Sequence, residues 1–388
     1  MITEPMSVFA TLCLVAALTF SLSQTTILKP VFSKLPPIIW LYFTPMVLTS
    51  LSVLPDQSDV YSWMSRYLLL VALFLLTLSV DIKSLIQVSK PAAIMLLVGT
   101  LSITVGSVVV FAGTQSILPA NGWQGISMLS ASWIGGSANM LAMQQNLQVN
   151  PNAMGPIVIT DTVVGYGWLS IVILAAAFQP AIDRALGADD SKLNQVSEIA
   201  TDLEKEKHPV QLPALAMIVG FGFFIAIIAR KVADGLPQFG DPVIISQSTW
   251  AVIFIVSLGL GLSLTPVQKL RRNGSAEIGY VALYMLVTTI GAQADLRSVT
   301  QAPGYLVAGA LILVFHATAM VLALRVLRYP VFFAVVGSIA NVGGAASAPI
   351  AASAYRPALS PIGALLGVCG YMFGIYAPLF IAWVTSKI

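Results

Sequence analysis

The chain has 388 residues, of which 57% are hydrophobic and only 9% are charged, and its mean hydropathy is +0.88. Soluble domains carry about 25% charged residues, so this composition excludes a soluble globular protein and indicates an integral membrane protein. The net charge of +3 is small and the basic residues are scattered among loops, which excludes a nucleic-acid partner. Cys13 and Cys369 lie in apolar segments, so they predict neither a disulfide nor a metal site.

Apolar segments of about 20 residues recur along the chain, the length that crosses a hydrocarbon core roughly 30 Å thick. The N-terminal segment carries Glu4 and no Lys or Arg before its apolar run, so we interpret it as a membrane helix and not as a signal peptide. Residues 183–209 are too polar to cross a membrane and are interpreted as a connector. We therefore predict an all-α membrane protein with about twelve transmembrane segments, near residues 6–23, 36–54, 63–80, 91–112, 124–147, 153–179, 211–229, 245–265, 275–292, 304–327, 330–354 and 358–384.

The two halves of the chain resemble each other. "DIKSLIQ" at 81–87 matches "DLRSVTQ" at 295–301, and "IGGSANMLAMQQ" at 134–145 matches "VGGAASAPIAAS" at 342–353. Two matches in the same order, at nearly the same spacing, predict an internal duplication with repeats at 1–182 and 210–388.

The relative orientation of the repeats is decided by their positive charges. Six segments per half and a polar connector would make the repeats parallel. The Lys and Arg residues, however, concentrate in opposite loops of the two halves, as they do in inverted-repeat transporters. We favour inverted repeats, in which case the segment count is wrong by one between residues 81 and 295. The loops concerned contain Lys29, Lys34, Lys83 and Lys90 in the first half and Lys269, Arg271, Arg272, Arg325 and Arg328 in the second.

Each repeat contains a glycine pair inside its fifth segment. A lipid-exposed break in a helix leaves backbone groups without partners, so breaks persist only against protein or a wet cavity. We predict a discontinuous crossing helix in each repeat, with a substrate site at the break. An alternative is that the small residues only allow close helix packing. The candidate substrate-binding residues are Gly135, Gly136, Ser137, Asn139, Asn341, Gly343, Gly344 and Ser347.

Asp161 is a carboxylate inside the sixth segment, with Thr160 and Thr162 on either side. Ionisable groups at such positions are costly to bury and usually functional, and a bound cation would offset that cost. Alternatively, Asp161 lies near a helix end and caps it. His316 is the other titratable group inside a segment. It either makes ordinary hydrogen bonds within the bundle or neighbours Asp161 and shares its proton. These four residues are our candidates for cation coupling.

The stretches at 132–171 and 338–356 resemble the YjcL-like family of uncharacterised bacterial and plant membrane proteins. That family looks like a distant member of the superfamily of sodium/proton antiporters and bile-acid/sodium symporters. The resemblance implies a panel or dimerisation part at 1–90 and 210–303. It also implies a core part at 91–182 and 304–388 that moves like an elevator. Asp161 occupies the place of the ion-carrying carboxylate of the antiporters. Threonines flank it where the antiporters have a second Asp or an Asn, which leaves room for an organic substrate.

We therefore predict a secondary active transporter of a small solute, an organic anion, amino acid or small peptide-like anion, coupled to sodium or protons. The alternatives are a cation/proton antiporter without organic substrate and a non-transporting receptor or scaffold. No enzyme motif is present, so we expect no enzyme activity. No cofactor is expected, apart from a bound sodium ion. The expected partners are the solute, the coupling ion, the lipid bilayer and a second copy in a homodimer. The expected location is the bacterial cytoplasmic membrane.

Overall fold

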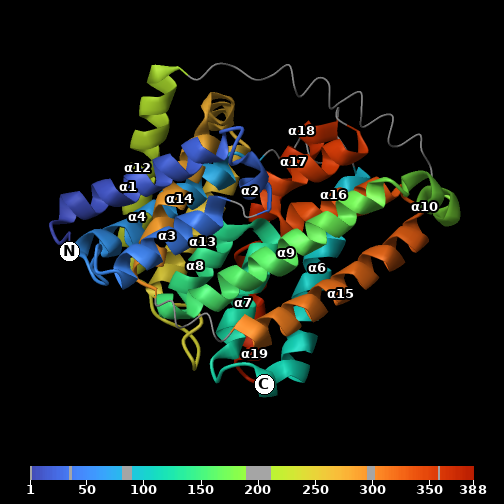
Figure 1. Cartoon of the computed structure of the whole chain (residues 1–388), viewed down its shortest axis with the longest axis horizontal. Helices are drawn as coiled ribbons and strands as arrows, with labels where there is room; N and C mark the ends of the chain where they lie inside the picture. Colours follow the sequence, from blue (N-terminus) through green and yellow to red (C-terminus); the bar gives the residue numbers. More distant parts are fainter. Residues whose placement is uncertain (1, 35–36, 81–89, 189–210, 295–301, 357–358) are drawn as a thin grey trace.

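The computed structural model describes residues 2–34, 37–80, 90–188, 211–294, 302–356 and 359–388 (Figure 1). The regular structure of these residues is helical, apart from one isolated bridge between Phe239 and Ile245. Seven of the described helices are long and apolar enough to cross a membrane, and the bent pair α18–α19 would make eight. The paired motifs at 81–87 and 295–301 and most of the predicted connector lie outside the described residues.

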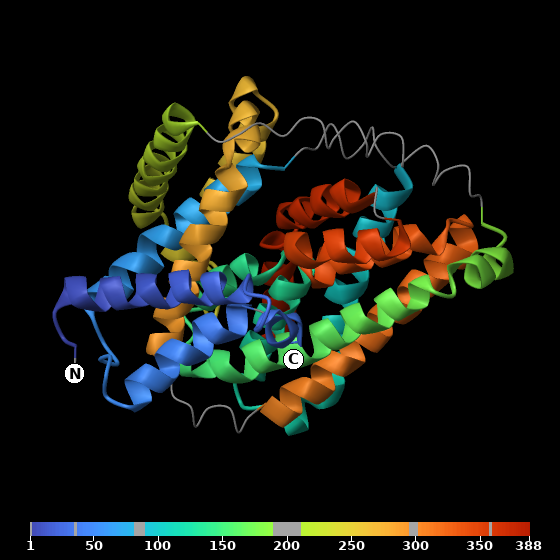
Figure 2. The same ribbon diagram turned by 45° about the horizontal axis from the view of Figure 1, so that its top comes forward.

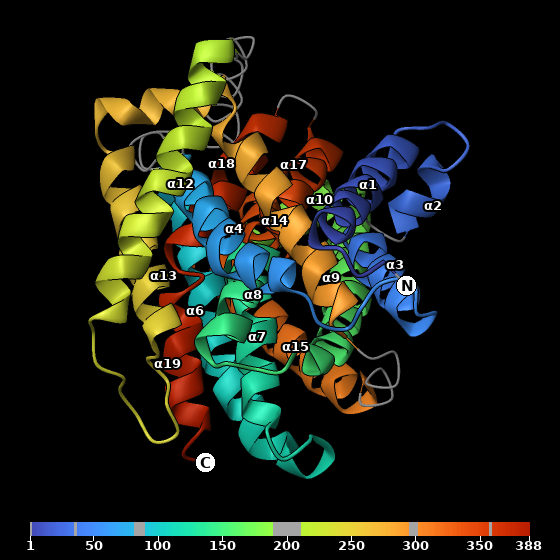
Figure 3. The same cartoon turned by 90° about the vertical axis from the view of Figure 1, so that its left-hand side faces the viewer.

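The helices pack into two groups, and each group contains helices from both halves of the chain (Figures 1 and 3). The α4–α14 group takes three helices from each half of the chain. It consists of α1 (Pro5–Ser23), α3 (Pro37–Ser50), α4 (Asp59–Leu78), α12 (Leu212–Asp234), α13 (Gln247–Ser263) and α14 (Ser275–Ala292), with the short α2 (Lys29–Lys34) and η3 (Pro266–Asn273).

The second group, the hairpin group, holds the remaining helices and likewise draws on both halves. Figure 2 shows α9 and α15 running beside each other along one edge of it. Its first-half members are α6 (Lys90–Thr114), η1 (Gln115–Ile117), α7 (Gly122–Gly135), α8 (Ser137–Asn146), η2 (Pro151–Ala153), α9 (Met154–Ala176) and α10 (Gln179–Leu186). Its second-half members are α15 (Ala302–Leu327), α16 (Val331–Val342), α17 (Gly344–Tyr355), α18 (Ser360–Cys369), η6 (Gly370–Met372) and α19 (Tyr376–Thr385).

Helices at equivalent places in the two halves run antiparallel. Ser79 at the end of α4 hydrogen-bonds Ser275 at the start of α14, with 2.7 Å between the hydroxyl oxygens. At the other end of the pair, the Thr289 hydroxyl lies 3.2 Å from the Met64 sulfur. Glycines allow the close approach, because Gly279 faces Leu75 and Leu76 directly. Helices α6 and α15, the first helix of the hairpin group in each half, are antiparallel as well.

In that second pair, α6 and α15, the contacts also run in opposite order along the two helices. Ser102 of α6 hydrogen-bonds His316 of α15 at 2.7 Å, whereas Gly304 near the start of α15 packs against Ile117, just beyond the end of α6. Antiparallel equivalents are the arrangement expected of inverted repeats.

The glycine pairs do not interrupt crossing helices as the sequence predicts. They are the turning points of two helical hairpins. In the hairpin α16–α17 the ring of Tyr355 at the end lies 6.0 Å from the ring of Phe332 at the start. The chain reverses at Gly344, which has a φ of 58°, a left-handed conformation that favours glycine. Helix α18 then runs back inward along α17, with Gly363 against Ala348.

The hairpin α7–α8 turns at Gly136, which has φ 94° and ψ 175°, a region that essentially only glycine occupies. Near its start, Gly125 packs against Tyr305 at the beginning of α15. Its end returns to the same side of the molecule, because the Gln145 side chain donates a hydrogen bond of 2.6 Å to the carbonyl of Ser65, near the beginning of α4. Hydropathy cannot separate such a hairpin from one interrupted crossing, because both have the same length and composition.

Candidate functional site

A cavity of about 130 Å³ lies where the tips of the two hairpins meet. The tips are in contact, since a methyl group added at Gly344 would lie 3.5 Å from Cα of Gly136. The cavity also reaches the α4–α14 group, so it sits between the two groups of helices. It is lined by Pro37, Ile38, Ser132, Gly136, Ser137, Asp161, Gly165, Tyr166, Leu169, Tyr280, Leu283, Tyr284, Val342, Gly343, Gly344, Ala345, Ser347 and Tyr371.

Two helices begin at the cavity wall. No side chain caps the N-terminus of α8, which starts at Ser137, or that of α17, which starts at Gly344. The first N–H groups of a helix have no partner within the helix, and together they carry a partial positive charge of about half a unit. Both hairpin tips therefore present hydrogen-bond donors and positive potential to the cavity, which suits an anionic group.

Asp161 of α9 contributes the negative charge of the cavity and is partly exposed to it. Ser132 and Trp133 of α7 lie beside its carboxylate. The Trp133 indole is fully buried, and its N–H has no hydrogen-bond partner of full geometry among the described residues. Gly165, one turn along α9, keeps this corner open, because a methyl group there would lie 3.5 Å from the indole nitrogen. None of the lining residues is Lys, Arg or His, so no basic side chain of the cavity neutralises Asp161.

Tyrosines form a large part of the cavity wall, and they were not predicted from the sequence. Tyr280 and Tyr284 come from α14 and stack at 5.9 Å between ring centroids. Tyr371 of η6 comes from the hairpin group, and its hydroxyl lies 3.3 Å from that of Tyr280. The spacing of four residues between Tyr280 and Tyr284 puts both on one helix face, a signal that the sequence did contain.

The structure brings half of the predicted site residues together at the cavity. Thr160 and Thr162 are buried beside Asp161 but do not line the cavity. Gly135, the last residue of α7, packs against Gly370 and does not line the cavity either. Asn139 and Asn341 are buried behind the tips. The predicted residues that line the cavity are Gly136, Ser137, Asp161, Gly343, Gly344 and Ser347.

His316 does not neighbour Asp161, which corrects the sharper of the two sequence interpretations. Both ring nitrogens are held at 2.7 Å by serine hydroxyls, those of Ser102 and Ser338. The Trp168 indole donates to the same Ser338 hydroxyl at 2.8 Å. Trp168 and Asp161 are both on α9 but about two helical turns apart, roughly 10 Å along the axis. The histidine therefore belongs to a paired hydrogen-bond cluster between α6, α15 and α16.

Asn341 is held as firmly as His316. Its side-chain amide donates to the carbonyls of Leu96 and Gly337, each at 2.9 Å, and its oxygen accepts from Thr100 at 2.8 Å. It therefore ties the end of α16 to α6 and has no free group for a solute. No group of three or more His, Cys, Asp or Glu side chains able to hold a metal occurs in the part of the chain that the structure describes.

Comparison with known proteins gives a family for this chain. Residues 10–388 match the model of a family described as protein of unknown function DUF819. The chain belongs to this family. It is similar to the uncharacterised membrane protein YjcL of Bacillus subtilis (strain 168), with 27% identity over 354 residues, which cover 88% of each chain. The resemblance to the YjcL-like family that the sequence indicates is thereby confirmed. With its apolar helices, this relationship shows that the DUF819 chain is a multi-pass integral membrane protein.

Proposed function

We propose that this protein is a secondary active transporter of a small solute, coupled to sodium or protons. The observation that carries the proposal is the place of the cavity. It lies between the two groups of helices, with the hairpin tips and Asp161 on one side and Tyr280 and Tyr284 on the other. A site at such a boundary is opened to one side or the other when the groups shift relative to each other, which is what alternating access requires.

We further propose that each half of the chain makes five crossings and one re-entrant hairpin. The hairpins explain the disagreement of one segment between the positive charges and the count, because a hairpin returns to the side it came from. Counting α7–α8 as re-entrant reverses the direction of every later helix, as the antiparallel pairs α4–α14 and α6–α15 require. In this proposal the α4–α14 group is the panel and the hairpin group is the moving core of an elevator. The homodimer remains a prediction.

Asp161 would couple the ion to the solute by charge neutralisation. The helix N-termini favour an anion in the cavity, whereas an ionised Asp161 repels it. Two unit charges 4 Å apart interact by roughly 4 kcal/mol at an effective dielectric constant of 20. A sodium ion or proton on Asp161 removes that repulsion, so each ligand strengthens binding of the other. A small organic anion or an amino acid, carrying a carboxylate for the tips, meets these demands.

The test is a solute screen on the purified protein, with unfolding temperature measured in sodium chloride and in choline chloride at two pH values. A ligand at 100 times its dissociation constant stabilises the native state by about 2.7 kcal/mol. A stabilising solute is then tested for uptake into proteoliposomes with an imposed sodium or proton gradient. Uptake that neither gradient accelerates would reject the proposal.

A second candidate function rests on Asp161 itself, the single carboxylate among the residues that line the cavity. A cation/proton antiporter needs such a carboxylate and no organic substrate. Sodium-dependent proton flux in proteoliposomes without added solute would favour this function over solute transport.

A further inference from the structure

The hairpin tips have a second face, behind the cavity, where the C-terminal ends of three helices meet. Helices α7, α16 and α18 all end around Gly370. A methyl group added at Gly370 would lie 3.1 Å from the carbonyl oxygen of Ile134 and 3.2 Å from that of Ala340. The ends of three helices thus bring partial negative charge to one buried place. The positive ends of α8 and α17, by contrast, face the cavity on the other side of the tips.

The carbonyls of Ile134 and Ala340 lie beyond the last residue of their helix whose carbonyl accepts an intrahelical hydrogen bond. In α7 that bond runs from the Gly136 N–H to the Ser132 carbonyl at 2.7 Å, and in α16 it runs from the Gly343 N–H to the Ile339 carbonyl at 2.8 Å. Ile134 and Ala340 lie beyond these acceptors, and no backbone N–H from the described loops or caps donates to either oxygen. Carbonyls in this position ordinarily need a partner from outside the helix.

Asn139 supplies the independent sign that a ligand belongs here. Its side chain is 0% exposed, and neither the oxygen nor the nitrogen of its amide has a hydrogen-bond partner. The amide nitrogen packs directly against Gly135, which contacts Gly370, and against Gly374, whose N–H donates to the Gly370 carbonyl at 3.1 Å. A buried amide with neither atom paired is costly and rare in folded proteins, and such groups commonly mark a bound ion or water.

We propose that a sodium ion binds here, with the Asn139 amide turned over so that its oxygen takes the place of its nitrogen. The ion would lie between that oxygen and the carbonyl oxygens of Ile134 and Ala340, with water completing its shell. Neutral oxygen donors at helix C-termini suit a monovalent cation. Calcium and magnesium sites use carboxylates, and none is present among these donors. The ion would join the tip of α7–α8 to the α18–α19 break and so hold the opposite, N-terminal ends in place at the cavity. This site is distinct from Asp161 and does not depend on the transport proposal.

The experiment is sodium binding to the purified full-length protein, by unfolding temperature and by equilibrium binding of radioactive sodium. Sodium, potassium and choline chlorides are compared at constant ionic strength. We expect stabilisation by sodium but not by potassium or choline. Asn139→Leu should stay folded and weaken sodium binding at least tenfold. Asn146→Leu, a matched control at a buried asparagine of the same helix, should bind sodium normally. Asp161→Asn should still bind a sodium ion at the Asn139 site, whatever it loses at the cavity.

Two results would overturn the proposal directly. Equal responses to sodium and potassium would indicate a general salt effect, and unchanged binding by Asn139→Leu would exclude this ligand. Loss of binding in Asp161→Asn alone would place the sodium at the cavity. If Asn139→Leu does not fold, Asn139→Asp takes its place and should bind sodium more tightly, because it keeps the oxygen and adds a charge; weaker binding would contradict the site. Sodium binding without any solute uptake would leave this site standing and reject only the transporter.

Discussion

The two hairpins have the same architecture and different attachments. Each places an asparagine near its tip, and both asparagines are fully buried. Asn341 of α16 makes three hydrogen bonds, all within the hairpin group, whereas the side chain of Asn139 of α8 makes none. Where the hairpin α16–α17 ends, the Tyr355 hydroxyl bonds the carbonyl of Val172 of α9, again within its own group, at 3.3 Å.

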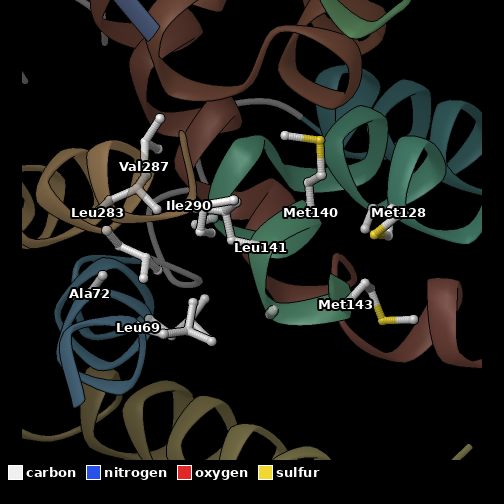
Figure 4. Packing of buried hydrophobic residues seen from close by; sticks show 14 of the residues in the cluster. Leu69, Ala72, Met128, Met140, Leu141, Met143, Leu283, Val287 and Ile290 are labelled. Atoms are coloured by element: carbon white, nitrogen blue, oxygen red, sulfur yellow. The ribbon is translucent and has the colours of Figure 1, made fainter. Parts of the chain in front are cut away.

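The hairpin α7–α8 is attached to the other group instead. Gln145 donates to the Ser65 carbonyl of α4, and the Ser246 hydroxyl before α13 donates to the Asn146 carbonyl at 2.9 Å. Figure 4 shows Leu141 of α8 extending toward Ile290 of α14. One hairpin is thus a rigid part of its group, and the other joins the two groups. A shift of the groups must loosen the α7–α8 attachments first, so the two hairpins should respond differently to substitution.

The largest effect on ion-dependent uptake is expected from Asp161, which follows the hairpin α7–α8. No carboxylate lines the cavity from the described helices that follow the hairpin α16–α17. Asp161→Asn removes the charge that binds the coupling ion, and ion-dependent uptake should fall by at least about 100-fold, equivalent to roughly 2.7 kcal/mol of cation binding. The unfolding temperature should not fall. Asp234→Asn, which removes a carboxylate paired with Arg230 on α12, is the control and should transport normally. Normal coupling in Asp161→Asn would contradict the proposed mechanism.

The next largest effect is expected on the free energy of unfolding, when the asparagine near each hairpin tip is replaced. Asn341→Leu strands the partners on α6 and should lower the free energy of unfolding by about 1–3 kcal/mol. Asn139→Leu strands no protein partner, so in sodium-free solution it should be neutral or stabilising. Denaturant unfolding in detergent measures both. Equal losses in the two variants would show that the asparagines are held alike.

The tips can be tested through their glycines. Gly136→Ala forces alanine into a backbone region that costs about 1–3 kcal/mol, although the space around it is open. Gly167→Ala, on the exposed side of α9 with no atom within 4 Å, is the matched control and should be neutral or gain up to about 1 kcal/mol. Thermal unfolding of both variants decides whether the tip conformation is required.

The smallest effect on stability is expected at the ends of the two hairpins that lie away from the cavity. Ser246→Ala removes the bond to Asn146 and the cap of α13, at a cost of about 1 kcal/mol. Tyr355→Phe removes one long hydrogen bond and should cost less than about 0.5 kcal/mol. Only Ser246→Ala should change how fast a cysteine placed in the cavity reacts with a thiol reagent, because of the two bonds compared here only that of Ser246 joins the two groups of helices. Equal reaction rates in the two variants would argue against this role.

Much of this protein follows from its sequence alone. Composition determines that it resides in a membrane, because 9% charged residues cannot cover a soluble surface. The glycine pairs mark the two places where helices stop, since breaks tolerated inside a membrane need protein or water around them. The sequence also indicates that Asp161 is functional, because a carboxylate inside a membrane segment is costly to bury. The positive charges indicated opposite orientations even though the segment count disagreed.

Only the tertiary structure decided how the chain continues after each glycine pair and which polar groups meet. Hydropathy is the same for a hairpin and for a crossing, and the backbone angles at Gly136 and Gly344 separate them. His316 is paired with serines because α6 and α16 pack against it, and the tyrosines reach the cavity from the other group of helices. Partners distant in sequence are set by packing, which no local pattern records. The same cause leaves Asn139 unpaired while Asn341 is fully bonded.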